Sequence, residues 1–376
     1  MKPIPFNKPF IIGRELSLIV DAVAQGHLSG DGTYTKLCNR WFEEKLGCHK
    51  ALLTHSCTAA LEMTAILCDI QPGDEVILPS YTFVSTANAF VLRGGVPVFV
   101  DIRPDTLNID ENLIEAAITS RTKAIIPVHY AGVPCEMDRI MAIAANHDLL
   151  VVEDAAQALL SSYKGKALGS IGHFGCLSFH ETKNIISGEG GALLVNDKRF
   201  IERAEVIREK GTNRSRFFRG EVDKYTWVDI GSSYLPSELV SAFLYAQLER
   251  ADEIIARRRD ICVAYAAQLA DLQQTGHLRL PVFDRDSNGH MFYILVDSLA
   301  TRGKLIAHLK SQDILPVFHY VPLHSAPAGI KFGRIGSTMR QTDEISQCLL
   351  RLPLYYEMTE ADIKRVCTAI NEFFSG

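Results

Sequence analysis

At 376 residues, with 47% hydrophobic and 22% charged side chains, the chain can bury a large core and predicts one large domain plus a smaller one. Its net charge of −5 gives no overall basic field, and no dense Lys/Arg run with interleaved aromatics is present, which argues against a nucleic-acid partner. The N-terminus lacks the apolar segment of a secretion signal, and every longer apolar run is interrupted before membrane-spanning length, so we expect a cytoplasmic protein.

Between residues 50 and 200, short apolar runs alternate with helical patterns, which predicts βαβ units around a mainly parallel sheet. Near-continuous apolarity is typical of strands covered on both faces, and the expected strands are residues 75–78, 98–100, 124–128 and 149–153. The expected helices carry apolar residues at helical spacing, over residues 58–67, 85–92, 111–117 and 136–146. This order of elements predicts an α/β fold.

The pattern changes after residue 236, where a long helical stretch rich in Ala, Leu, Arg and Glu spans residues 237–272. We expect it to carry the chain from a large domain, residues 1–236, into a small α+β domain, residues 237–376. The N-terminal residues could also pack with the small domain. Elements expected there are a strand at 290–296, a helix at 304–310 and a last helix from Glu360.

The segment from Arg208 to Tyr234 is dense in charged, aromatic and glycine residues and has no clean period. It is too long for an ordinary connector, and long irregular segments in compact domains are usually functional or disordered. We therefore expect a functional loop at residues 208–234.

The nine cysteines are scattered singly between Cys38 and Cys367, and none forms a C-x-x-C pair. Their odd number and irregular spacing argue against a disulfide framework and against a thiolate metal site. We expect reduced, mostly buried thiols and no bound metal.

The run from Leu53 to Leu61 places small hydroxyl residues where an apolar strand turns into a helix. Free N–H groups and the dipole at a helix N-terminus attract anions, so this run predicts a phosphate site. An ordinary helix cap would use the same residue types. The glycine fingerprints of nucleoside triphosphate and NAD sites are missing.

Asp154 ends a buried apolar strand, directly after Glu153. In open α/β sheets ligands bind beyond the carboxyl ends of the strands, so Asp154 is placed to reach a bound molecule. It could equally cap a following helix.

Lys183 lies between two short apolar strands and precedes a glycine-rich turn, Gly188–Gly191. Most lysines are solvated surface charges. A nucleophilic lysine must lose its proton, because only the neutral amine condenses with an aldehyde. Partial burial and a nearby cation would lower the pKa of the amine in this way.

Taken in order, the phosphate-cradling turn, the strand-end aspartate and the lysine before a glycine turn resemble a fold-type I pyridoxal-phosphate enzyme. Over nearly its whole length the chain is similar to the sugar aminotransferases of the DegT/DnrJ/EryC1/StrS family, and within it to the dTDP-4-amino-4,6-dideoxygalactose transaminases. The segments that carry this narrower resemblance are Pro127–Gly132, Phe179–Asn184, Lys210–Ser215, Phe217–Gly220, Asp223–Trp227 and Phe318–His324.

The resemblance implies a large domain with a mainly parallel sheet flanked by helices, and pyridoxal 5′-phosphate as cofactor. Lys183 would hold the cofactor covalently and then shuttle a proton, while Asp154 would keep the pyridine nitrogen protonated. The other implied cofactor contacts are Cys57, Thr58 and Ser178 at the phosphate, Phe83 on the ring face, Gln157 at the ring and its phenolic oxygen, and Ser233 at the phosphate of a partner subunit. Phe83 could instead be a core side chain.

For the substrates, the resemblance implies glutamate as donor and dTDP-4-keto-6-deoxyglucose as acceptor, in the biosynthesis of cell-surface polysaccharide such as lipopolysaccharide or enterobacterial common antigen. It also implies a homodimer with active sites at the interface, over which the 208–234 loop closes. Lys210, Arg214 and Arg219 would meet the diphosphate or the donor's carboxylates, although each could be a solvated loop charge. His319 and Tyr320, with His324 nearby, would contact the sugar.

Two positions depart from the family pattern. Cys57 stands where many members have glycine, so the close approach of the backbone to phosphate is in doubt. The segment Gly231–Pro236 lacks the usual asparagine and arginine. Ser233 could donate a hydrogen bond in place of the asparagine, and the role of the arginine is not carried over.

Several alternatives stay open. Transamination could occur at C3, at C4 with gluco stereochemistry, or on a UDP sugar, because a sequence does not show which sugar face meets the cofactor. A sugar dehydratase of the same fold would carry histidine in place of Lys183. A non-catalytic scaffold or regulator would need an appended DNA-binding module or a broken Lys183–Asp154 pair, and neither is present.

Overall fold

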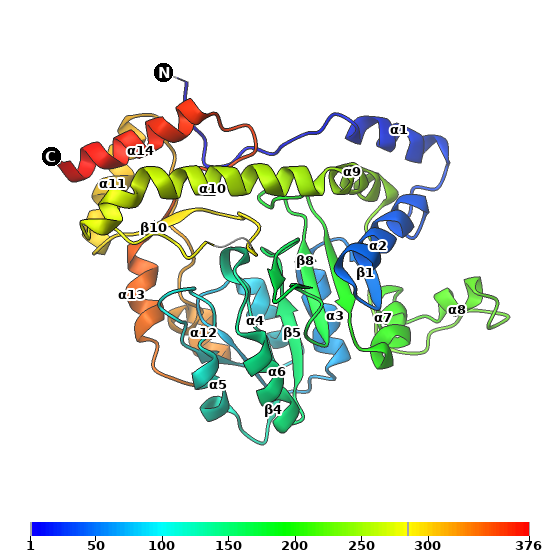
Figure 1. Cartoon of the computed structure of the whole chain (residues 1–376). Helices are drawn as coiled ribbons and strands as arrows, with labels where there is room; N and C mark the ends of the chain where they lie inside the picture. Colours follow the sequence, from blue (N-terminus) through cyan, green and yellow to red (C-terminus); the bar gives the residue numbers. More distant parts are fainter. Residues whose placement is uncertain (1, 284–285, 376) are drawn as a thin grey trace.

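The computed structural model describes residues 2–283 and 286–375, and its centre is a mixed sheet with the strand order β1-β9-β8-β5-β4-β2-β3-β11 (Figure 1). Within it, β9 pairs antiparallel with both of its neighbours, and the other pairs are parallel. In sheet order the strands are β1 (Lys50–Thr54), β9 (Gly191–Val195), β8 (Phe174–Ser178), β5 (Leu150–Asp154), β4 (Thr122–Ile125), β2 (Glu75–Pro79), β3 (Val96–Val100) and β11 (Arg334–Ile335). This arrangement confirms the predicted α/β fold.

The sheet is buried on both faces. Successive side chains of a strand point to opposite faces, so Ala51 and Leu53 of β1 join one core while Leu52 joins the other. The first core is covered by α2 (Thr33–Leu46), α5 (Glu111–Ala117) and α6 (Met137–Asn146), and the second by α3 (Cys57–Leu67), α4 (Val84–Val91) and α7 (Ile201–Arg208). Burial on both sides explains why the strands are apolar along their whole length.

A third core lies toward the C-terminus, away from the sheet. The expected single helical stretch is two helices, α9 (Glu238–Glu249) and α10 (Ala251–Gln274), which meet at Arg250. Ile4 joins this core and pairs with Ile314 through a parallel bridge. The other elements that contribute are α11 (Leu299–Ser311), α14 (Glu360–Ser375), β10 (Tyr293–Leu295) and β12 (Leu349–Arg351). The division into domains at residue 236 stays a prediction.

The helices expected between residues 50 and 200 agree with α3, α4, α5 and α6 to within one residue at each end. The expected strand at 124–128 is different, because β4 ends at Ile125 and the chain continues as a loop that bridges Val128 to Asp154. The remaining short elements are α1 (Glu15–Ala24), α8 (Arg214–Phe218), α12 (Pro327–Phe332), α13 (Arg340–Cys348), β6 (Ser162–Tyr163), β7 (Lys166–Ala167) and the 3-10 turns Tyr130–Gly132, Lys198–Phe200 and Leu323–Ser325.

All nine cysteines are free thiols, and seven of them are buried. In the described part of the chain, no helix combines the length and the apolar character that crossing a membrane requires.

Candidate active site

The carboxyl ends of several parallel strands open on one cavity of about 420 Å³. Because β9 runs antiparallel, its first residue, Gly191, lies at the same edge, where it pairs with Ser178 and Thr54. A Cβ on Gly191 would come within 2.3 Å of the Ser56 carbonyl carbon, so glycine lets β9 pack against the turn that starts α3. The cavity brings together the predicted residues Cys57, Thr58, Phe83, Asp154, Gln157, Ser178, Lys183, His319 and Tyr320.

Lys183 lies on the loop between β8 and β9 and lines the cavity. The loop is closed at its base by the Phe179 N–H, which donates to the Gly190 carbonyl at 2.8 Å. Burial lowers the pKa of the Lys183 amine, and the Arg351 cation acts in the same direction, while Cys57 and Asp154 oppose the change. A lowered pKa raises the share of neutral amine, which is the form that can act as a nucleophile.

Asp154 is the last residue of β5 and is 5% exposed. Its Oδ2 atom accepts a hydrogen bond from Thr86 Oγ1 at 2.7 Å, and its Oδ1 atom accepts one from the Ala156 N–H at 3.2 Å. Among the described elements, β5 is followed by β6 and not by a helix, so Asp154 has no helix to cap. An ionised carboxylate has further lone pairs, and these are available to a molecule in the cavity.

The first turn of α3 forms one end of the cavity. Ser56 caps this helix, because its Oγ accepts the Ala59 N–H at 3.1 Å. Ser56 is therefore the capping residue, and the two residues that follow it, Cys57 and Thr58, line the cavity. Thr58 Oγ1 is hydrogen-bonded to Ser85 Oγ at 2.8 Å. Together with Ser178, these hydroxyls and the helix N-terminus form a suitable site for an anionic group.

Phe83, Gln157 and Tyr320 also line the cavity. The Phe83 side chain is 55% exposed and lines the cavity, so it is not a core side chain. Gln157 is fixed at both ends of its amide, because Oε1 accepts the Ala131 N–H at 2.7 Å and Nε2 donates to the Tyr320 hydroxyl at 2.8 Å. Phe83 thus offers an aromatic side chain, and Gln157 a fixed amide, to a molecule in the cavity.

His319 stacks on Tyr320 with ring centroids 3.7 Å apart, and its Nδ1 is 2.6 Å from the Tyr130 hydroxyl. Burial lowers the pKa of His319 well below its usual range, which keeps the imidazole neutral. His324 is not part of the cavity lining and is hydrogen-bonded to Ser80 Oγ at 2.8 Å through its Nδ1.

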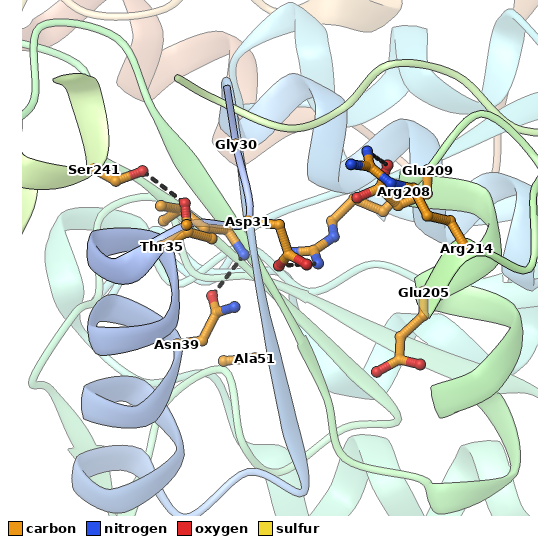
Figure 2. Close-up of polar contacts among 12 residues, drawn as sticks. Gly30, Asp31, Thr35, Asn39, Ala51, Glu205, Arg208, Glu209, Arg214 and Ser241 are labelled. Carbon is orange, nitrogen blue, oxygen red and sulfur yellow. Dashed lines mark hydrogen bonds and ion pairs between the residues drawn. The ribbon is translucent and has the colours of Figure 1, made fainter. Parts of the chain in front are cut away.

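Ser233 and the three basic residues of the 208–234 loop that were predicted to bind substrate, Lys210, Arg214 and Arg219, do not line this cavity. Arg214 and Glu209 form an ion pair, drawn in Figure 2, with an N–O distance of 3.4 Å, and Lys210 is 3.9 Å from the same carboxylate. Arg219 contacts Glu205 at 2.8 Å. Helix α8 projects away from the body of the molecule, at the right of Figure 1. The roles of these four residues in binding stay predictions.

Several residues that line the cavity were not singled out from the sequence, among them Thr86, His290 and Arg351. Thr86 lies on a helix that the sequence predicts, one turn after Thr82. The sequence does not indicate that the Thr86 hydroxyl contacts Asp154. His290 is held by Asn184, with Nδ1 to Oδ1 at 3.0 Å. Arg351 comes from β12, beside the third core, and no local pattern connects it to Lys183.

The donor set fits pyridoxal 5′-phosphate. A neutral amine can hold the aldehyde, a carboxylate can pair with the ring nitrogen, and a helix N-terminus with hydroxyls can hold the phosphate. The Cys57 side chain, which stands where many family members have glycine, does not block the cavity, because Ser56, Cys57 and Thr58 all line it. The fold and this cavity define the class of fold-type I pyridoxal-phosphate enzymes.

Residues 11–371 match the model of the DegT/DnrJ/EryC1/StrS aminotransferase family, and the chain belongs to that family. It is 34% identical over 382 residues to the spore coat polysaccharide biosynthesis protein SpsC of Bacillus subtilis (strain 168), covering 99% of this chain and 97% of SpsC. The aminotransferase TlmJ of Streptoalloteichus hindustanus superposes with a TM-score of 0.90 at 28% identity, over 99% of both chains.

Spr1654 of Streptococcus pneumoniae, described as a candidate sugar aminotransferase, has been solved in a PLP form and a PMP form. The PLP form superposes with a TM-score of 0.90 at 26% identity, over 100% of this chain and 99% of that one. The PMP form gives 0.91 at 26% identity, over 99% of both chains. The protein is thus a pyridoxal-phosphate-dependent sugar aminotransferase, with a sugar substrate and an amino donor.

Proposed function

We propose that the chain transfers an amino group from an amino acid, glutamate, to the C4 keto group of dTDP-4-keto-6-deoxyglucose, giving dTDP-4-amino-4,6-dideoxygalactose. The observation that carries the chemistry is the meeting of the Lys183 amine and the Asp154 carboxylate in one cavity. The segments Lys210–Ser215 and Phe318–His324 support this acceptor through their resemblance to the corresponding transaminases. The printed name of SpsC supports a role in making a polysaccharide precursor, and we propose that this step is cytoplasmic.

Lys183 and Asp154 carry the reaction in this proposal. When bound, pyridoxal 5′-phosphate supplies a ring that withdraws electrons from the reacting carbon. Lys183 would hold the cofactor and would then act as the base and acid at the donor's Cα, for which the lowered pKa of its amine is favourable. Asp154 keeps a proton on the ring nitrogen.

The remaining cavity residues hold and orient the cofactor. The Thr58 and Ser178 hydroxyls and the N–H groups of the first turn of α3, at Cys57 and Thr58, bind the phosphate. Phe83 would hold the ring by its face, and Gln157 would contact the ring and its phenolic oxygen, since both line the cavity. His319 and Tyr320, which line the cavity from the C-terminal part of the chain, contact the sugar.

Arg351 supplies the cation that an amino-acid donor requires. Its Nε is buried without a hydrogen-bond partner within the described residues, and its guanidinium lies 4.6 Å from the Phe6 ring centroid. It lines the cavity together with Lys183. Because guanidinium groups bind carboxylates through two parallel hydrogen bonds, we propose that Arg351 holds a carboxylate of the donor.

Arg351→Met is expected to raise the KM for glutamate by roughly 10- to 100-fold, the loss of a charge-assisted hydrogen-bonded pair. The half-reaction with the keto sugar, started from enzyme already loaded with the amino form of the cofactor, should keep its rate. Single-turnover kinetics of the two half-reactions measure this. Arg302→Met is the matched control, because Arg302 lies 5.8 Å from the Phe318 ring and does not line the cavity. Equal losses in both half-reactions would contradict the assignment.

We propose a homodimer in which the 208–234 loop covers the cavity of the partner subunit. The base of the loop is fixed in its own chain, where Arg208 pairs with Asp31 at 3.0 Å (Figure 2). Further out, Phe218 is 66% exposed and Trp227 is 79% exposed, an apolar surface that favours a protein contact. In the dimer the loop residues that would reach the partner's phosphate or substrates are Ser233, Lys210, Arg214 and Arg219.

The test of the proposed function incubates the protein with pyridoxal 5′-phosphate, glutamate and a panel of keto-sugar nucleotides, followed by NMR of the amino sugar. The expected product is the 4-amino galacto sugar linked to dTDP. Product from a UDP sugar, amination at C3 or a gluco epimer would replace the proposed substrate or stereochemistry. Loss of a hydroxyl without amine incorporation would instead indicate a dehydratase.

A further inference from the structure

The carboxylate of Asp154 is held by a chain of two threonine hydroxyls. Thr86 Oγ1 donates to Asp154 Oδ2 at 2.7 Å, and Thr82 Oγ1 lies 2.9 Å from Thr86 Oγ1. Thr82 and Thr86 are 2% and 0% exposed, and both line the cavity. These contacts join the start of α4 to the end of β5.

The direction of this chain follows from proton counting. An ionised carboxylate can only accept, so the single hydroxyl proton of Thr86 goes to Asp154. The Thr86 oxygen must then accept the proton of Thr82. The sequence of donors is therefore Thr82, Thr86, Asp154, and each hydroxyl strengthens the next hydrogen bond by polarising it.

Helical threonines usually return their hydroxyl to a carbonyl one turn earlier in the same helix. Thr86 instead has Thr82 Oγ1 and Asp154 Oδ2 as its side-chain partners. Thr64 shows the ordinary pattern, because its buried hydroxyl donates to the Leu61 carbonyl at 2.7 Å. The Thr86 hydroxyl is thus directed at the carboxylate and does not serve its own helix.

We propose that Thr86, supported by Thr82, is a positioning residue that fixes the orientation of the Asp154 carboxylate and stabilises its charge. This inference rests on the proposed pairing of Asp154 with the ring nitrogen of the cofactor. A hydrogen bond donated to a carboxylate stabilises its charged form and so weakens its hold on a proton. The shared proton consequently stays on the ring nitrogen, where it keeps the ring electron-withdrawing.

The experiment uses the cofactor-loaded enzyme and compares Thr86→Val, Thr86→Ser and Thr82→Val. The first readout is the pH titration of the visible absorbance of the lysine-bound cofactor, which reports the electronic state of the ring. Without the Thr86 hydroxyl the Asp154 carboxylate is held less well against the ring nitrogen, and the ring becomes less electron-withdrawing. The titration midpoint of the lysine-bound cofactor should therefore rise by roughly half to one pH unit in Thr86→Val. Thr86→Ser should stay within about 0.2 pH units of the parent, because it keeps the donor.

The second readout is the division of the kinetic effect. Thr86→Val should lower kcat by roughly 10- to 100-fold with little change in either KM, as expected when one hydrogen bond to a charged group is lost. Thr82→Val should show a smaller change of the same sign. Thr64→Val, which removes a buried hydroxyl outside the cavity, should leave the titration unchanged.

Two outcomes separate failure of this inference from failure of the proposed function. If Asp154→Asn moves the titration midpoint and Thr86→Val does not, the pairing of Asp154 stands and the role of Thr86 is wrong. If neither variant moves it, the pairing itself is wrong. Should Thr86→Val fold poorly because Thr82 loses its acceptor, the double variant Thr82→Val/Thr86→Val removes both hydroxyls, and an unchanged midpoint in it would equally overturn the proposal.

Discussion

Replacement of Lys183 by alanine is expected to abolish amine transfer and the visible absorbance of the lysine-bound cofactor. No other lysine lines the cavity in the described part of the chain, so no second amine can take over the covalent role. This replacement removes both the nucleophile and the acid/base group, and acid/base catalysis alone typically contributes about 10²- to 10⁴-fold to a rate. Absorbance spectra and product NMR measure both effects on the same sample.

Lys166→Ala is a suitable control for Lys183→Ala, because Lys166 is an exposed residue of β7 outside the cavity. It should load the cofactor and turn over like the parent protein. Phosphate-dependent binding of the cofactor should persist in Lys183→Ala, since the first turn of α3 is untouched. Retained amine transfer in Lys183→Ala would contradict the assignment of Lys183 as the residue that holds the cofactor.

The second large effect is expected for Asp154→Asn, which keeps the shape of the side chain and removes its charge. Without the carboxylate the ring nitrogen loses its proton, and the rate of the proton transfer at Cα should fall by roughly 10²- to 10³-fold. Stopped-flow measurement of the half-reaction with glutamate isolates this step. The affinity for the keto sugar should change little, because the proposed partner of Asp154 is the ring nitrogen of the cofactor and not the sugar.

Asp101→Asn provides the comparison for Asp154→Asn. Asp101 is 3% exposed, directly follows β3 and accepts hydrogen bonds from the backbone and hydroxyl of Thr342, at 2.8 and 2.7 Å. Its replacement should lower thermal stability while leaving the rate per folded molecule unchanged. An Asp154→Asn enzyme with parental stopped-flow rates would show that the carboxylate has no part in the chemistry.

The sequence predicted the sheet well because the local and the global signals agree in this part of the chain. Strands such as β2 and β5 are buried on both faces, so their apolar runs are long and unbroken, and α3 to α6 show their periods between them. The strand expected at 124–128 was too long at its end, because residues 126–128 are apolar but form the loop that reaches Asp154. Apolarity reports burial there and not strand pairing.

The candidate site was predictable where one short segment carries its own chemistry. Asp154 ends a strand and Lys183 precedes a glycine turn, so both were readable from their neighbours in the sequence. Arg351 was not, because it reaches the cavity from β12 in the C-terminal part, and only the packing of the third core brings it near Lys183. The bond from Thr86 to Asp154 spans 68 positions and depends on how α4 lies over β5.

The residues that line the cavity come from two parts of the chain, the region of the central sheet and the C-terminal segments. Asp154 ends a strand of the central sheet, Lys183 lies on a loop between two of its strands, and α3 packs on it. Tyr320 and Arg351 instead come from segments that pack with the C-terminal elements. The Gln157–Tyr320 hydrogen bond is one of several polar contacts between these two parts, together with Tyr130–His319 and Asn184–His290. Loosening of the C-terminal elements would therefore leave a yellow protein that still keeps its chromophore but no longer recognises either substrate, so colour alone is a poor guide to whether a preparation is active.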